Sequence, residues 1–166
     1  MVIYGNVYDC LIVGNTFKNA ANGCIVRDGN SYNCTIVSNT AAAAANYIFR
    51  GGNHYNDLIF NNKYSDTLLD NYDTPALYNC WTDCDFSKKN SASTFIVGTD
   101  PKVREDGTLK TGSHCINAGS NDYYTATQKS TLRLTDIYGK SRVLNKIIDI
   151  GCTENPAVAG MVLIVR

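Results

Sequence analysis

Four charged residues within residues 1–86 could act on a polysaccharide, namely Asp57, Asp83, Asp85 and Arg50. A polysaccharide lyase needs carboxylates that hold Ca²⁺ and a basic residue beside the sugar, whereas a glycoside hydrolase needs two carboxylates at a set separation. The same acidic residues also serve as ordinary solvated turns. The sequence therefore assigns no catalytic residue, and these four are weak candidates only.

A second set of side chains could bind a ligand without transforming it. Four tyrosines recur along the chain at nearly equal intervals, and two arginines are separated by the same interval. On strands stacked about 4.8 Å apart, such recurring side chains form a stripe that could contact a sugar chain. The tyrosines could equally stack on one another and serve only the fold. The candidate ligand-binding residues are Tyr8, Tyr32, Tyr55, Tyr78, Arg27, Arg50 and His54.

A sequence repeat must position these side chains. Aligned on the tyrosines, the matching blocks span residues 5–16, 29–40, 52–63 and 75–86, and each block is typical of a β-strand. A fixed period of about 20 to 50 residues indicates a solenoid. No leucine consensus and no helical periodicity are visible. The pattern predicts an all-β chain in which residues 1–86 form a parallel β-helix, with coils of about 23 residues each.

The aligned rows predict which side chains face inward and which turn the chain. We expect two rows to line the core, because β-branched and small side chains fit a narrow interior. A row of asparagines at the strand ends is expected to turn the chain and to bond from coil to coil. The core rows are Ile12, Ile36 and Ile59 with Cys10, Cys34, Asp57 and Cys80, and the asparagine row is Asn15, Asn39 and Asn62.

The repeat degrades in its fourth block, and residues 87–166 do not continue the period. We expect this second part to be a β-rich cap that closes the end of the stack and covers its side. Two outward rows are apolar enough to need such a cover, because large apolar patches rarely face water. These rows are Leu11, Thr35, Leu58 and Trp81 with Val13, Val37 and Phe60.

The chain has seven cysteines, an odd number, so at least one cannot pair within the molecule. We expect a ladder of small buried thiols, since a free cysteine behaves as a small hydrophobic residue. Cys80 and Cys84 have only His54 and His114 as possible histidine partners, and neither histidine has the spacing of a zinc site. No metal and no cofactor are expected.

The charge balance argues against some partners. The 15 basic and 15 acidic residues cancel and form no basic run, so neither nucleic acid nor an anionic membrane is favoured. The longest apolar stretch, residues 161–165, is far shorter than the roughly 20 residues of a membrane span. The chain begins inside a repeat, and solenoids need end caps. We therefore expect a fragment of a longer chain, an N-terminal partner segment, or a homo-oligomer.

Residues 94–154 resemble the end region of bacterial right-handed β-helix surface proteins, the group whose closing signature is DIGAYE and which often carries a choice-of-anchor domain. Three segments carry the resemblance in order: 100–103 with 109–119, then 135–143, then 148–154. The resemblance implies a right-handed, pectin-lyase-like β-helix in which these motifs are architectural. Arg142 with Asp149 or Glu154 would then suit a charge-assisted pair that pins the cap.

Three functions follow as hypotheses. The favoured one is a non-catalytic, extracellular or cell-surface β-helix module of a larger bacterial protein, used for adhesion or for contact with a polysaccharide or cell-surface glycan. The first alternative is a polysaccharide lyase or glycoside hydrolase of the β-helix type. The second alternative is a structural part of a phage tail or fibre assembly.

Overall fold

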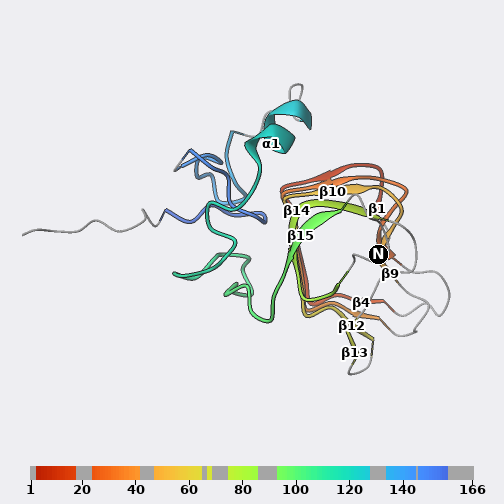
Figure 1. The fold of residues 1–166 in the computed structure, drawn as a ribbon. Helices are drawn as coiled ribbons and strands as arrows, with labels where there is room; N and C mark the ends of the chain where they lie inside the picture. Colours follow the sequence, from red (N-terminus) through yellow and green to blue (C-terminus); the bar gives the residue numbers. More distant parts are fainter. Residues whose placement is uncertain are drawn as a thin grey trace, which may run out of the picture.

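The computed structural model describes residues 3–17, 24–41, 47–64, 67–68, 75–85, 93–127, 134–144 and 146–156. The described chain is mostly β, and its parallel strands form a curled sheet beside a second, irregular part (Figure 1). No helix in these ranges is long and apolar enough to cross a membrane.

Each of the first three repeats contributes strands to three separate sheets, whereas the described part of the block at residues 75–86 contributes only to the central one. The first sheet, at the right in Figure 1, is wholly parallel. The third sheet is parallel except for its last, antiparallel strand. The first sheet contains β1 (Ile3–Tyr4), β5 (Cys24–Arg27) and β9 (Tyr47–Arg50); the third contains β4 (Thr16–Phe17), β8 (Thr40–Ala41), β12 (Lys63–Tyr64) and β13 (Thr67–Leu68).

The second, central sheet has two arms that meet in one long strand, β14 (Ala76–Thr82), which pairs with the last strand of each arm. A further strand, β15 (Thr94–Val97), pairs with β14 in parallel. One arm contains β2 (Val7–Tyr8), β6 (Ser31–Tyr32) and β10 (Asn53–Tyr55); the other contains β3 (Leu11–Val13), β7 (Thr35–Val37) and β11 (Leu58–Phe60).

The strand register confirms the sequence period. Tyr8 pairs with Tyr32, Tyr32 with Tyr55, and Tyr55 with Tyr78, so each step up the sheet is one sequence repeat. Equivalent side chains therefore lie directly above one another on neighbouring strands. Any chemistry that recurs in the sequence recurs in space at the strand spacing.

A corner between the two arms follows each tyrosine and requires a left-handed backbone. The corner residues are Asp9, Asn33, Asn56 and Asn79, with φ between 47° and 56°. Aspartate and asparagine tolerate this region because their short polar side chains bond locally. The residue type at this row is thus set by backbone geometry, and its side chains project from the corner.

The asparagine row at the next corner forms the expected ladder. The amide of Asn15 donates to Asn39 Oδ1 at 3.0 Å, and the amide of Asn39 donates to Asn62 Oδ1 at 2.8 Å. Asn39 and Asn62 are buried. The ladder satisfies polar groups that would otherwise be costly inside the stack.

The predicted inward rows line the core. Ile12, Ile36 and Ile59 are buried together with Cys34 and Cys80 in one apolar cluster. All seven cysteines are free thiols, and all except the partly buried Cys10 are buried. The interior is therefore apolar at most levels.

The outward apolar rows are covered by the second part of the chain, as expected. Val37, Leu58 and Trp81 pack in a second cluster with side chains from residues 103–150. The contributors from that part are Leu109, Cys115 and Ile150, with Val103, Ile116 and Ala118 at the edge. A backbone bond from Gly151 N–H to Asn56 O at 2.8 Å joins the two parts.

In the second part, β15 lies within the expected cap and adds a strand to the parallel sheet; Phe86, at the expected boundary, lies outside the described residues. Beyond β15 the described residues contain fewer strands than a β-rich cap would have. The described residues after Val97 form turns, two isolated bridges and one short helix, α1 (Asn121–Thr127). Packing onto the apolar rows of the sheet, rather than strand pairing, organises this part.

Candidate functional site

The four candidate catalytic residues do not form one accessible cluster. Asp57 is fully buried inside the stack, whereas Asp85 is exposed after β14. Asp83 Oδ2 accepts a hydrogen bond from the backbone N–H of Asn61 at 2.7 Å, in the corner after β11. Arg50 ends β9 in the first sheet. A substrate outside the stack has no access to Asp57.

Asp57 belongs to a buried polar group that the sequence did not reveal. Its Oδ1 accepts the backbone N–H of Cys34 at 2.7 Å, and its Oδ2 bonds to the hydroxyl of Ser31. The same hydroxyl lies 2.7 Å from Nδ1 of His54, whose Nε2 lies 3.1 Å from the carbonyl of Gly51. Burial raises the pKa of Asp57 to about 7 and lowers the pKa of His54 to about 3.

These three residue types also make up hydrolytic triads, but the arrangement differs. In a triad, histidine lies between the serine and the aspartate. Here the serine lies between the other two, and Ser31, His54 and Asp57 are all fully buried. The His54 ring stacks on Phe49 with a centroid separation of 3.6 Å. His54 therefore does not share an exposed surface with the tyrosine row.

The tyrosine row forms a continuous stack. The ring centroids of Tyr8, Tyr32, Tyr55 and Tyr78 are separated by 4.8, 5.0 and 5.0 Å with nearly parallel planes. Tyr123 from α1 packs against two of these rings, at 5.0 and 5.7 Å. The ring faces that a sugar would need are thus occupied by neighbouring tyrosines, and burial raises the pKa of Tyr32 to about 12.

The arginine row lies on the first sheet and gains an aromatic neighbour. Tyr4 pairs in register with Arg27, and Arg27 pairs with Arg50. The guanidinium carbon of Arg27 lies 5.8 Å from the centroid of the Tyr4 ring, within cation–π range. Tyr4 is 67% exposed. We call Tyr4, Arg27 and Arg50 the Tyr–Arg stripe; Arg27 also forms a 3.5 Å surface pair with Asp28.

The corner row binds the second part of the chain through polar contacts, in addition to the packing of Tyr123 on the tyrosine row. Asn79 donates its amide to Ala118 O at 2.9 Å. Asn56 donates to Ser120 O at 3.0 Å and accepts from Ser120 N–H at 2.8 Å. Asp9, at the same corner of the first repeat, pairs with Arg142. Corner side chains from three repeats therefore bind the cap through hydrogen bonds and an ion pair.

Arg142 is fully buried at the centre of this contact. Its Nε lies 3.3 Å from Asp9 Oδ1, its Nη1 lies 3.3 Å from Glu154 Oε1, and its Nη2 donates to Gly151 O at 2.7 Å. The expected pair with Glu154 is present. Burial raises the pKa of Glu154 to about 8, while the charge of Arg142 acts in the opposite direction. Asp149 contributes through its backbone, which donates to Glu154.

The chain was compared with protein-family models, with curated proteins and with solved structures. None of them matches. The resemblance of residues 94–154 to DIGAYE surface proteins therefore stays a prediction from the residues.

Several residues of these sites were missed from the sequence. Asp9 occupies a row of asparagines, and that substitution was the available signal of a charged partner. Tyr4 lies one period before Arg27, just outside the aligned blocks. Ser31 and Tyr123 gave no signal, because neither residue recurs in a row of like side chains.

Proposed function

We propose that this chain is a non-catalytic, extracellular or cell-surface module of a larger bacterial protein, built as a right-handed parallel β-helix with a cap. In this proposal the module contacts a glycan through the Tyr–Arg stripe on the first sheet. The stacked register of the repeats and the corner contacts to the cap support the architecture. The burial of Asp57 favours contact over catalysis.

The observation that carries the proposal is the register of Tyr4, Arg27 and Arg50 on adjacent strands. This register repeats cationic groups at the strand spacing of about 4.8 Å, beside an exposed aromatic ring. An aromatic face packs against the apolar face of a sugar, and a guanidinium binds a carboxylate or sulfate in a bidentate manner. The stripe therefore fits an anionic sugar chain better than a neutral one.

The Arg27–Asp28 pair does not oppose such binding. The Asp28 side chain is 68% exposed, and exposed pairs contribute only about 0 to 1 kcal/mol. An anionic ligand that makes two bonds to the guanidinium can displace this contact at little cost. The 15 basic and 15 acidic residues of the whole chain cancel, so the stripe is a local feature and not part of a broad basic field.

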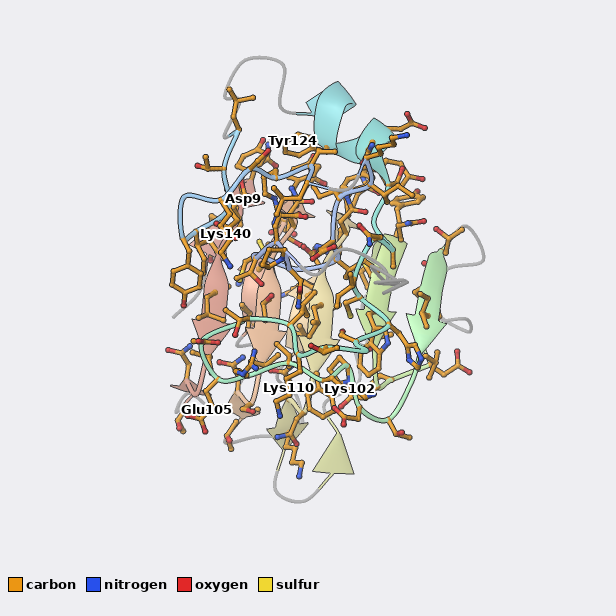
Figure 2. All side chains as sticks on the ribbon, turned by 90° about the vertical axis from the view of Figure 1, so that its left-hand side faces the viewer. Asp9, Lys102, Glu105, Lys110, Tyr124 and Lys140 are labelled. Atoms are coloured by element: carbon orange, nitrogen blue, oxygen red, sulfur yellow. The ribbon has the colours of Figure 1, made fainter. Side chains whose placement is uncertain are left out.

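Binding to polyuronate and to a neutral glucan tests the proposal. We expect the chain to bind polyuronate at low salt, and we expect this binding to weaken as added salt screens the charges. An Arg27→Gln/Arg50→Gln variant should lose binding about tenfold or more. A Lys102→Gln/Lys110→Gln variant removes the same charge from the cap side of the molecule, where Figure 2 shows both lysines. Equal losses in both variants would show that net charge, not the stripe, causes binding.

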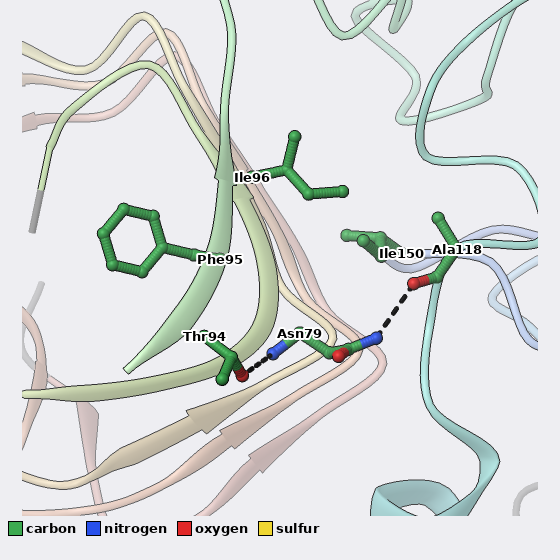
Figure 3. Close-up of a pocket in the computed structure, with 6 residues that line it drawn as sticks. All are labelled: Asn79, Thr94, Phe95, Ile96, Ala118 and Ile150. Carbon is green, nitrogen blue, oxygen red and sulfur yellow. Dashed lines mark hydrogen bonds between the residues drawn. The ribbon is translucent and has the colours of Figure 1, made fainter. Parts of the chain in front are cut away.

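A specific observation also favours a structural role in an assembly. β15 is the last strand of the central sheet, and no other described strand pairs with its outer edge. Its side chains Ile96 and Val97 are 43% and 53% exposed. A groove of about 240 Å³ runs beside this strand, lined by Ile96, Ala118 and Ile150 among others (Figure 3). Exposed apolar edge strands are ready sites for pairing with another chain.

Light scattering at micromolar concentration tests this second candidate. An assembly through β15 predicts an oligomer for the unmodified chain and a monomer for Ile96→Lys. A monomeric unmodified chain that still binds polyuronate would leave only the first candidate.

A further inference from the structure

The buried group formed by Ser31, His54 and Asp57 joins neighbouring repeats. Ser31 belongs to β6, whereas His54 and Asp57 come from the next repeat, in β10 and before β11. Asp57 also binds the backbone N–H of Cys34 in the repeat of Ser31, at 2.7 Å. Two repeats are thus joined by side-chain bonds as well as by the sheet.

The available protons fix the direction of these bonds. His54 Nε2 faces the carbonyl oxygen of Gly51, which only accepts, so Nε2 carries the imidazole proton. Nδ1 of the neutral ring must then accept, and the Ser31 hydroxyl donates to it. Because Ser31 has only one proton, its bond to Asp57 Oδ2 requires a proton on the carboxyl. Every polar atom of the group is satisfied in this state.

The opposite assignment leaves unfavourable contacts. An ionised Asp57 would accept the hydrogen bond of the Ser31 hydroxyl. Nδ1 of a neutral His54 would then have no hydrogen-bond donor. A doubly protonated His54 would repair this, but burial lowers the pKa of that ring to about 3. Among the described residues, no cationic side chain forms an ion pair with Asp57. A buried carboxylate without a cation is strongly disfavoured.

The groups around Asp57 act in the same direction. Burial is the largest influence and raises the pKa of Asp57, and Asp9 and Cys10 raise it as well; hydrogen bonding with Ser31 and with the backbone of Cys34 lowers this pKa, but by less. The other titratable neighbours are neutral when Asp57 titrates: burial raises the pKa of the thiols of Cys34 and Cys80 and of the Tyr32 hydroxyl.

We propose that Asp57 is held as a neutral carboxylic acid that locks the second and third repeats together, and that loss of its proton unlocks them. The module is then tightly stacked in acid and loosened in alkali, with the change centred on β6 and β10. The lock is a pH-sensitive element inside the stack, separate from the Tyr–Arg stripe.

The carboxyl ¹³C resonance of Asp57 in the full chain tests the protonation state directly. We expect it to titrate near neutral pH, well above the value of about 3.9 for an exposed aspartate. Titration near that ordinary value would overturn the proposal. This measurement needs no variant, so it decides the matter even where a substitution prevents folding.

Amide hydrogen exchange of β6 and β10 tests the unlocking. As the pH rises through neutrality, we expect their protection to fall at least tenfold beyond the intrinsic change. Asp57→Asn should keep its protection, because the Asn amide donates to Ser31 while its oxygen still accepts from Cys34. Unchanged protection in the unmodified chain, or an equal loss in the Asn variant, would overturn the unlocking step.

Discussion

Replacing Arg142 by methionine should detach the cap from the first repeat. Arg142 is fully buried, and its charge faces Asp9 and Glu154 at 3.3 Å each. Methionine keeps an unbranched apolar chain of similar reach, so the loss is mainly electrostatic. Removing one partner of a buried ion pair costs about 3 to 5 kcal/mol. In a chain of this length, each kcal/mol lowers Tm by about 2 to 4 °C, which gives a fall of about 6 to 20 °C.

The loss of unfolding free energy caused by Arg142→Met should grow as the pH rises. Burial already raises the pKa of Glu154 to about 8, and loss of the Arg142 charge raises it further. A carboxyl whose pKa is raised in the folded protein contributes its stability at low pH and loses it as the pH rises. The Arg142→Met deficit should therefore be smallest near about pH 5 and largest near about pH 8.

Urea unfolding followed by tryptophan fluorescence measures this deficit. Trp81 is the single tryptophan and packs in the apolar cluster between the sheet and the cap. Arg104→Met is the matched control, because Arg104 is exposed, and it should change the free energy of unfolding by less than about 0.5 kcal/mol.

Unfolding of Arg142→Met within about 1 kcal/mol of the unmodified chain at both pH values would contradict the buried ion pairs as the source of this stability.

Three further substitutions test other parts of the account by the same unfolding assay. Asp57→Asn should stabilise the chain more at about pH 8 than at about pH 4, by about 4 kcal/mol, because the raised pKa of Asp57 makes its ionisation costly as the pH rises. Asn39→Ala should cost about 1 to 3 kcal/mol, since it leaves the buried ladder incomplete. Gly52→Ala should cost at least about 1 to 3 kcal/mol, because φ is +85° and a Cβ would lie 1.9 Å from Gly29 O. An unchanged free energy of unfolding in any of these variants would contradict the interaction or backbone constraint that the substitution tests.

The periodic parts of the fold could be predicted from the sequence. A stacked register places residues one period apart in contact, so the rows of Ile36 and Asn39 could be assigned without coordinates. The need to cover Leu58 and Trp81 likewise predicted a cap along the sheet. Periodic positions can be predicted because equivalent residues of stacked repeats have equivalent surroundings.

The non-periodic contacts could not be predicted. The resemblance pairs Arg142 with Asp149 or Glu154, both nearby in the sequence, and the structure has the Glu154 pair; the second partner, Asp9, comes from the first repeat. Asp57 is a weak catalytic candidate from the sequence because a lyase or hydrolase needs carboxylates, although its row is expected to face inward. The hydrogen bond between Asp57 and Ser31 of the neighbouring repeat allows the carboxyl to be buried. Pairs between distant or unique residues leave no pattern along the chain.

Calorimetric titration of the full chain with a short oligogalacturonate, followed by mass analysis of the recovered sugar, tests the proposed function most directly. We predict saturable binding that weakens with salt and is lost in Arg27→Gln/Arg50→Gln, and we expect to recover the oligosaccharide intact. An absence of binding at low salt, or recovery of shortened or unsaturated products, would contradict a non-catalytic module that contacts anionic glycans.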